Sequence, residues 1–336
     1  MDTTDKQSSI DISTDPRSQL ASCHVGVVIP AYRVAAQIKQ VIEEIPEFVK
    51  TIVVVDDCSP DNTSEIVISL NNSKVHLVQH KKNQGVGGAV LSGYKKALEV
   101  GAEIVLKLDG DGQMDPKVIT HFILPIIEGK ADYTKGNRFL HGEQLKSMPL
   151  LRRLGNWALS FLTKLASGYW NIFDPTNGYT AIHAKLLRLI DMKHIHHRYF
   201  FESSMLVELN ICRAVVKDIP IPARYGEEKS SLSISKTLLQ FPVLLIERIL
   251  RRIKYQYFLL DFSACSLFIV LGTVFLLFGE TWGLYHWALS FSKKTVATTG
   301  TVMIAVLPTI LGFQLLIQAL VLDIQNTPKE VIHRKC

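Results

Sequence analysis

The fold is decided by the stretch Ile104-Val105-Leu106-Lys107-Leu108-Asp109-Gly110-Asp111-Gly112-Gln113. Its first half is an apolar run of the length of a buried strand, and its second half is small, polar and acidic. In layered α/β proteins, ligands bind at the carboxyl ends of parallel strands, where the loops leave the sheet. We therefore expect a strand that ends in a ligand-binding turn.

Short β-branched runs alternate with helical segments on both sides of this stretch, from His24 to roughly Pro222. Further strands are predicted at Val25 to Pro30, Thr51 to Val55 and Val75 to Gln79, and helices at Gln37 to Ile45, Thr63 to Leu70 and Gly88 to Val100. Such alternation is typical of an α/β domain with a mainly parallel sheet.

Two other predicted strands also end in polar residues. These ends are Asp56-Asp57-Cys58-Ser59-Pro60-Asp61-Asn62-Thr63 and Asn83-Gln84-Gly85-Val86-Gly87-Gly88. A single acidic strand end can be a helix N-cap, as we expect for Asp61-Asn62-Thr63. Two acidic ends in one sheet indicate a site instead.

The acidic pair Asp109 and Asp111 predicts a metal site. One small residue separates the two, so the turn can aim both carboxylates, or one directly and one through water, at a hard divalent cation. Mg²⁺ or Mn²⁺ prefers oxygen ligands and shares its other positions with phosphates, and Gln113 can supply a further oxygen. A calcium-binding loop is excluded, because its turn glycine is replaced by Met114 and its twelfth position is Thr120. A structural turn is the remaining alternative.

The glycines after the third strand do not form a dinucleotide fingerprint. Gly85-Val86-Gly87-Gly88-Ala89-Val90 lacks the third glycine and does not follow the first strand, so a nicotinamide or flavin site is unexpected. The cluster can instead permit tight packing of a helix on the sheet.

Two long apolar runs near the C-terminus predict membrane spans. Phe258 to Phe278 is interrupted only by Asp261, and Gly300 to Leu322 contains no charge. Each is long enough to cross a hydrocarbon core of roughly 30 Å as a helix. The alternative is a pair of buried core helices, which are usually shorter and amphipathic.

Basic residues near these runs predict the orientation. Four basic residues precede the first run, namely Arg248, Arg251, Arg252 and Lys254. Three more follow the second run, namely Lys329, Arg334 and Lys335. The predicted loop between the runs contains Lys293 and Lys294 together with three aromatic residues, Trp282, Tyr285 and Trp287. The positive-inside rule predicts that both termini and the α/β domain are cytoplasmic, on a bacterial plasma membrane or, in a eukaryote, on the endoplasmic reticulum. Homo-oligomers through the spans are compatible with this arrangement.

Composition narrows the choice of compartment and partner. The net charge of +6 is modest, and its excess sits beside the apolar runs, which favours anionic lipid over nucleic acid as a partner. The five cysteines show no C-x-x-C spacing, which suits a reducing compartment. The first 22 residues have neither a basic region nor an apolar region of a secretion signal and are expected to be a disordered lead-in.

Taken together, these segments resemble the inverting GT-A glycosyltransferases of family 2, specifically the polyisoprenyl-phosphate glycosyltransferases. The resemblance lies in Val27 to Tyr32, Val55 to Thr63, Asn83 to Gly85, Lys107 to Gln113, Gly136 to Phe139, Asp174 to Tyr179, Phe201-Glu202 and Ala223 to Ser230, followed by two spans. It covers nearly the whole chain after residue 24. Each motif is weak alone, but the ordered set is specific.

The resemblance implies positions for the donor and the metal. Pro30, Tyr32, Asp57, Gly85 and Asp109 would lie around the nucleotide-sugar, with Asp109, Asp111 and Gln113 around the metal. Many relatives carry Asn-Glu after Pro-x-Tyr, whereas this chain carries Arg33-Val34, so contacts from that loop to the base are not assigned. The donor can be UDP- or GDP-linked.

Two helical segments between the sheet and the spans are apolar on one face and carry basic residues. They are Leu150 to Trp170 and Leu232 to Tyr257. Helices of this kind lie in the headgroup plane of a membrane and favour anionic lipid. Ordinary packing against the domain is the alternative. The chain is thus divided into a lead-in (1–22), a GT-A domain (23–230), juxtamembrane helices (231–257), a two-helix transmembrane region (258–323) and a cytoplasmic tail (324–336).

A phosphorylated lipid acceptor needs little proton chemistry from the enzyme. A phosphate monoester is largely a dianion at pH 7 and already a nucleophile, so cations that hold two phosphates in line should dominate the site. By resemblance, Arg138, Arg152 and Asn156 are candidates for the acceptor phosphate, Arg224 and Lys229 for the donor diphosphate, and Asp174 and Glu202 for orienting sugar or acceptor. Each could instead be a surface cation, a helix cap or a partly buried ion pair.

The resulting hypothesis is inverting transfer of one sugar from a nucleotide-sugar to undecaprenyl or dolichyl phosphate. A processive polysaccharide synthase is less consistent, because no Gln-x-x-Arg-Trp segment is present and two spans make a poor polymer channel. A membrane nucleotidyltransferase would share the paired aspartates. A non-enzymatic scaffold would tolerate Asp111→Asn. A zinc site at His194, His196 and His197 is disfavoured, because the Asp-x-Asp pair already supplies metal ligands.

Overall fold

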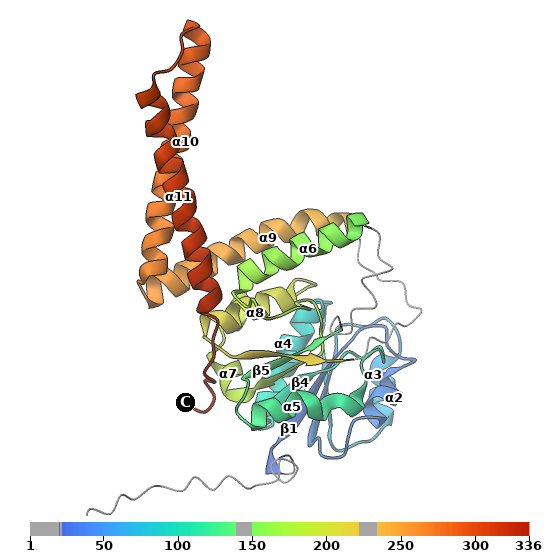
Figure 1. The fold of residues 1–336 in the computed structure, drawn as a ribbon. Helices are drawn as coiled ribbons and strands as arrows, with labels where there is room; N and C mark the ends of the chain where they lie inside the picture. Colours follow the sequence, from blue (N-terminus) through green and yellow to red (C-terminus); the bar gives the residue numbers. More distant parts are fainter. Residues whose placement is uncertain (1–19, 21, 139–149, 222–233, 336) are drawn as a thin grey trace, which may run out of the picture.

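The computed structural model describes residues 20, 22–138, 150–221 and 234–335, and it describes only the backbone of residues 150–156, 158 and 234–240. Figure 1 shows a layered α/β domain from which a long helical hairpin, α10 with α11, projects to one side. A pair of helices, α6 and α9, lies across the domain beside the base of the hairpin.

The domain is built on a seven-stranded sheet in the order β3-β2-β1-β4-β6-β5-β7. The strands are β1 (Val25–Ala31), β2 (Thr51–Asp56), β3 (Val75–Gln79), β4 (Ile104–Lys107), β5 (Tyr133–Asn137), β6 (Thr180–His183) and β7 (Val216–Pro220). The first four pair in parallel, β6 runs antiparallel between β4 and β5, and β5 pairs in parallel with β7. The prediction of a mainly parallel sheet is therefore confirmed.

Helices cover both faces of this sheet, and each face has its own core. One core contains α2 (Ile38–Glu43), α3 (Thr63–Ser69) and α5 (Ile119–Ile127), and the other contains α4 (Val86–Glu99), α7 (Ala184–Leu189) and α8 (Phe201–Ile211). Short 3-10 turns precede α5 at Pro116–Val118 and α8 at Met192–His194. Because β1 and β2 are buried on both faces, valine and isoleucine make up most of their residues, without alternating polar positions.

Helices α6 (Leu150–Ser167) and α9 (Ile234–Lys254) form a further layer over α8. Their contact is a small apolar core that contains Ala166, Val207 and Leu245. Their outer surfaces expose large apolar side chains, among them Trp157 and Phe161 on α6 and Val243, Ile246 and Leu250 on α9. The two predicted amphipathic helices therefore pack on the domain by one side and leave apolar surface on the other.

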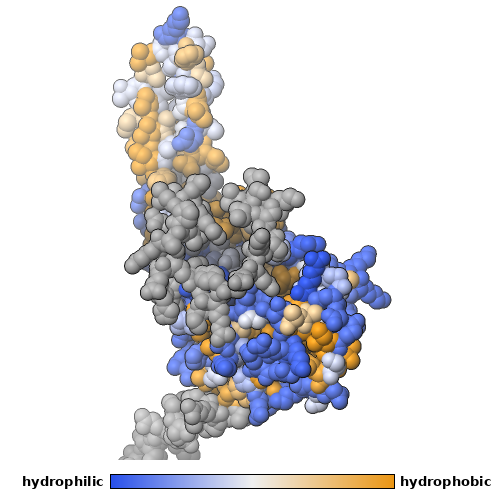
Figure 2. Space-filling model, turned by 90° about the vertical axis from the view of Figure 1, so that its right-hand side faces the viewer, coloured by the Kyte–Doolittle hydropathy of each residue, from blue (hydrophilic) through white to orange (hydrophobic). Residues whose placement is uncertain are grey.

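The two apolar C-terminal helices are α10 (Ala264–Lys293) and α11 (Thr299–Gln325), and both are long and apolar enough to span a membrane. Their outer surface is mostly hydrophobic in Figure 2. The first helix begins later than the predicted Phe258, because a π-helical segment, η4 (Tyr255–Leu260), comes first and Ser263 then starts α10 with a capping box to Ser266.

The predicted connecting loop is also shorter than expected. Helix α10 continues to Lys293, so Trp282, Tyr285 and Trp287 lie on the helix and not in the loop. No proline or glycine cluster interrupts residues 279–293, which is why the helix continues through these aromatics. Only residues 294–298 connect the two helices.

The segment after α11 returns to the catalytic domain. The buried carboxylate of Asp132, just before β5, accepts hydrogen bonds from the backbone N–H groups of Ile332 (2.9 Å) and His333 (3.0 Å) and from that of Val215 (2.9 Å). His333 Nδ1 lies 2.7 Å from the same carboxylate, and its ring stacks on His183 with a centroid separation of 4.4 Å. The tail therefore lies on the same side of the hairpin as the catalytic domain.

Candidate active site between two cavities

Asp109, in the turn after β4, lines two neighbouring cavities. Its carboxylate oxygen lies 2.6 Å from the ammonium nitrogen of Lys107, whose side chain is 1% exposed. Glu202, at the start of α8, approaches the same ammonium from the other side at 3.9 Å. The site is thus organised around one buried cation between two carboxylates.

The first cavity lies at the carboxyl ends of the parallel strands and has a volume of about 520 Å³. Six of the residues predicted to bind the donor or metal line it, namely Pro30, Tyr32, Asp57, Gly85, Asp109 and Asp111. They come from the ends of β1, β2 and β4 and from the loop before α4. Sequence analysis did not identify Arg198 and Tyr199, which close the cavity from the loop before α8.

Asp57 holds the loop that forms one wall of this cavity. Its carboxylate accepts hydrogen bonds from the backbone N–H groups of Gln84 (2.8 Å) and Gly85 (2.7 Å). His80 Nδ1 lies 2.7 Å from the same carboxylate, and His80 Nε2 lies 2.9 Å from Ser92 Oγ. Asp57 therefore shapes the cavity by fixing the backbone at Gly85.

The glycines after β3 have a packing role that is visible in the structure. Gly85 has a φ of +86°, and a Cβ on Gly87 would lie 2.3 Å from the carbonyl oxygen of His196. The Gly88 N–H donates a hydrogen bond of 2.9 Å to the carbonyl of His197. The cluster thus brings α4 against the loop that carries Arg198. Packing of a helix on the sheet depends on another glycine of α4, Gly93, whose Cβ would lie 2.2 Å from Val28.

The second cavity, of about the same size at 530 Å³, lies between the sheet and helices α6 and α9. Its polar lining includes Lys107, Asp109, Gln113, Arg138, Asn177 and Glu202. Leu159 of α6 and Phe241 of α9 supply apolar lining on the side of the helical layer. This combination of cations and apolar side chains suits a ligand with a charged group and a hydrocarbon part.

The predicted metal ligands are divided between the two cavities. Asp109 lines both, Asp111 lines the first, and Gln113 lines the second. The Gln113 N–H donates a hydrogen bond of 3.0 Å to Asp111 Oδ1, so the two residues share one tight turn. All three side chains carry oxygen atoms, so their chemistry fits a hard divalent cation.

Arg138 is held by Asp174 in a two-pronged ion pair. Its Nε and Nη2 atoms donate to the two carboxylate oxygens at 2.8 and 3.2 Å, and Asp174 is fully buried. Burial of Asp174 opposes its ionisation, but Arg138 keeps the pKa of this carboxyl below its usual value. Asp174 therefore orients the guanidinium group that lines the second cavity.

Two buried lysines behind the cavities were not identified as functional from the sequence. Burial alone would lower the pKa of Lys107, but Asp109 and Glu202 raise it above its usual value. Burial lowers the pKa of Lys135 to about 8, and its ammonium donates to the carbonyl of Asn177. Burial raises the pKa of Glu202. The sequence does contain one signal for a buried cation, because Lys107 is the only charged residue in the apolar strand Ile104 to Leu108.

Four of the predicted phosphate-binding residues cannot be placed in this site. Arg224 and Lys229 lie outside the described residues. Arg152 and Asn156 lie in α6, but the structure describes only their backbone and not their side chains. Their roles stay predictions.

Residues 26–190 match the family model described as Glycosyl transferase family 2. A UDP-N-acetylglucosamine–dolichyl-phosphate N-acetylglucosaminyltransferase from Methanococcus voltae is 34% identical over 216 residues, which cover 60% of this chain and 86% of the relative. The chain belongs to glycosyltransferase family 2. A second member, the undecaprenyl-phosphate mannosyltransferase of Micrococcus luteus, is 29% identical to this family 2 glycosyltransferase over 195 residues, covering 56% of it and 78% of the relative.

Solved structures show a similar fold. Glucosyl-3-phosphoglycerate synthase from Mycobacterium tuberculosis, in complex with Mn²⁺, UDP and phosphoglyceric acid, gives a TM-score of 0.53 at 18% identity, covering 70% of this glycosyltransferase and 81% of that chain. The same enzyme has been solved with Mg²⁺ and UDP. At this identity the likeness concerns the fold, and it confirms the predicted GT-A architecture.

Proposed function

We propose that this glycosyltransferase transfers one sugar, with inversion, from a UDP- or GDP-linked donor to a polyisoprenyl phosphate in the membrane. The observation that carries the proposal is the position of Asp109, which borders both cavities. One cavity lies at the strand ends, where α/β proteins bind nucleotides. The other lies under α6 and α9, and α9 leads through η4 into the apolar hairpin. A donor and a lipid acceptor would thus meet at Asp109.

A divalent cation, Mg²⁺ or Mn²⁺, would be held by Asp109 and Asp111, with Gln113 as a further oxygen ligand. When bound, it would neutralise charge on the diphosphate leaving group. The chain's own cations would assist from the acceptor side. Lys107 holds the shared carboxylate in place, and Arg138 presents donors to a phosphate while Asp174 fixes its orientation.

No strong general base is required in this scheme. The acceptor phosphate is largely a dianion at neutral pH, so the reaction depends on bringing two repelling phosphates into line. Arg138 on the second cavity supports this role, and Arg224, Lys229, Arg152 and Asn156 are proposed to contribute further contacts. The carboxyl group of Glu202 lies 3.9 Å from the ammonium of Lys107, so we assign it to Lys107 and the sugar rather than to a phosphate.

The membrane arrangement follows from the hairpin and its flanking charges. The exposed apolar side chains on α6 and α9 support a position of these helices at the lipid surface. Two of the cations expected to attract lipid are engaged elsewhere, because Arg251 pairs with Glu208 at 2.7 Å and Arg252 is buried. By the positive-inside rule, Lys254, Lys329 and Lys335 support a position of the domain and the tail on the cytoplasmic face.

Radiolabelled transfer by the purified full-length chain tests the proposal. UDP- and GDP-sugars would be offered with undecaprenyl or dolichyl phosphate and Mg²⁺ or Mn²⁺, beside the variant Asp111→Asn. We expect label in the lipid phase that requires the metal and is lost in the variant. No lipid label with any donor, in a folded sample that binds nucleotide, would refute the proposal. Release of pyrophosphate would identify a nucleotidyltransferase instead.

A further inference from the structure

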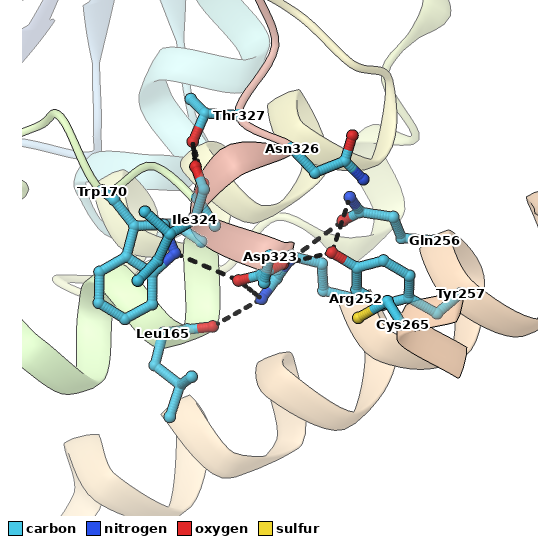
Figure 3. Close-up of polar contacts among 12 residues, drawn as sticks. Leu165, Trp170, Arg252, Gln256, Tyr257, Cys265, Asp323, Ile324, Asn326 and Thr327 are labelled. Carbon is cyan, nitrogen blue, oxygen red and sulfur yellow. Dashed lines mark hydrogen bonds and ion pairs between the residues drawn. The ribbon is translucent and has the colours of Figure 1, made fainter. Parts of the chain in front are cut away.

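Arg252 and Asp323 form a buried ion pair at the base of the membrane hairpin, outside both cavities. Arg252, near the end of α9, is 1% exposed, and Asp323, in the last turn of α11, is 7% exposed. The guanidinium Nη1 and Nη2 atoms donate to the two carboxylate oxygens at 2.7 and 3.0 Å. Figure 3 shows the pair at the centre of a converging set of polar side chains.

All five N–H groups of Arg252 are used. Besides Asp323, Nη1 donates to Gln256 Oε1 at 3.0 Å, Nε to the carbonyl of Ala166 at 3.0 Å, and Nη2 to the carbonyl of Leu165 at 2.9 Å. Ala166 and Leu165 belong to the last turn of α6, whose carbonyls lack partners within the helix. Arg252 therefore caps α6 while it holds α11.

The carboxylate of Asp323 also accepts hydrogen bonds from residues other than Arg252. Tyr257 donates its hydroxyl to Oδ1 at 2.5 Å, and the indole N–H of Trp170 donates to Oδ2 at 3.2 Å. Gly168 leaves the space in which the guanidinium sits, because a Cβ there would lie 2.8 Å from Arg252 Nη1. Segments from α6, α9, η4 and α11 thus meet at one carboxylate.

A cluster of this kind favours one arrangement more than it adds stability. Desolvation offsets much of the attraction of a buried ion pair, but an arrangement that leaves either charge unpaired is strongly disfavoured. The helices joined here are those that carry Leu159 and Phe241 into the second cavity. Their position relative to the hairpin is therefore fixed by Arg252 and Asp323.

We propose that Arg252 and Asp323 are positioning residues that hold the second cavity at a set height and angle to the bilayer, so that a membrane-embedded acceptor can enter it. The inference rests on the proposed function. It implies that the pair matters for an acceptor presented by the membrane and matters little for one that arrives from solution.

The test compares two acceptors in proteoliposomes that contain the full-length chain. One is a long polyisoprenyl phosphate in the bilayer, and the other is a short, water-soluble isoprenyl phosphate. For Asp323→Asn and Arg252→Lys we expect the KM for the long acceptor to rise about tenfold, as expected for lost positioning. The KM for the short acceptor and for the donor should change less than about twofold. Glu330→Gln, an exposed carboxylate of the same tail, is the matched control.

Equal losses with both acceptors would indicate a merely structural role, and unchanged kinetics would also overturn the inference. If Asp323→Asn does not fold, Tyr257→Phe and Trp170→Phe each remove one hydrogen bond to Asp323 without removing a charge. The KM values of these variants for the long and the short acceptor would then be compared in the same way. A wild-type protein that glycosylates neither acceptor would refute the proposed function itself. An active wild type with insensitive variants would refute only the positioning role.

Discussion

The ammonium of Lys107 lies 2.6 Å from the carboxylate of Asp109, and both belong to the same strand end. Lys107 points from β4 into the interior, where Gly178 leaves room for it, since a Cβ at that position would lie 2.3 Å from the ammonium. The carboxylate that borders both cavities is therefore positioned from behind by a buried cation.

Lys107→Met should destabilise the catalytic domain by about 3 kcal/mol, because it leaves two carboxylates near each other without their shared cation. Denaturant unfolding would measure the change. The double variant Lys107→Met/Glu202→Gln should recover part of the loss, since it removes one unpaired charge. Lys95→Met, at an exposed position of α4, is the control and should be nearly neutral. A single variant as stable as the wild type would contradict the role of this ion pair.

Asp109→Asn and Asp111→Asn should each lower kcat by at least about 100-fold, because each removes the charge of a carboxylate that we propose as a metal ligand. Initial rates of transfer at saturating donor and metal would show the loss. Asp191→Asn changes an exposed carboxylate that caps a 3-10 turn, lies 3.4 Å from His194 and lines neither cavity, so this variant should retain activity. Retention of most activity in Asp111→Asn would speak against a metal at this turn.

Gly87→Ala should raise the KM for the donor, because the added methyl would meet the His196 carbonyl at 2.3 Å and push away the loop that carries Arg198 and Tyr199. Overpacking of this kind costs about 1–3 kcal/mol, and stability should fall by a similar amount. Titration of UDP and GDP into the folded variant would measure the weakened site. Gly300→Ala, where the nearest atom lies 4.0 Å away, is the control. Unchanged nucleotide affinity would contradict the assignment of this loop.

Docking of the tail should weaken as the pH falls from about 6.5 towards 4. Burial, together with the neighbouring His333 and Lys185, lowers the pKa of His183 from 6.5 to about 4, although Asp132 and Glu103 oppose this shift. The undocked state therefore binds more protons in this window, and the docked state loses stability on acidification. Protonation of Asp132, whose pKa is also below its usual value, should add to the loss below pH 3.8.

Limited proteolysis of the tail at a series of pH values would test this dependence. We expect cleavage near residues 326–335 to accelerate between pH 6.5 and 4 in the wild type. His183→Gln should remove the dependence in that window, because glutamine can accept the Lys185 N–H but does not titrate. Equal dependence in the variant would assign the effect to another group.

The fold was predictable because its strands and turns are local features. Runs such as Val25 to Pro30 are buried on both faces and end at polar turns, so their type and order can be read directly. The antiparallel β6 and the docked tail were not predictable in this way. They depend on pairings between Ile104 and His183 and between Asp132 and His333, which lie far apart in the sequence.

The donor side of the site was more accessible to sequence reasoning than the acceptor side. Pro30, Asp57 and Asp109 each lie at or just after the end of a recognisable strand, and strand ends converge at one edge of a parallel sheet. Phe241 and Leu159 look like ordinary apolar residues of amphipathic helices, and only tertiary packing brings them to a cavity. Likewise, Arg252 was expected to face lipid headgroups, but its partner Asp323 lies 71 residues away.

The return of the tail to Asp132 means that the hairpin is attached to the domain at both of its ends. A domain that is connected to a membrane helix by a single flexible linker could rotate and tilt relative to the membrane. With two attachments, rotation about either connection would have to break contacts at the other. The hairpin and the catalytic domain should therefore move together as one rigid body. Bending of the hairpin would then be transmitted to the sheet.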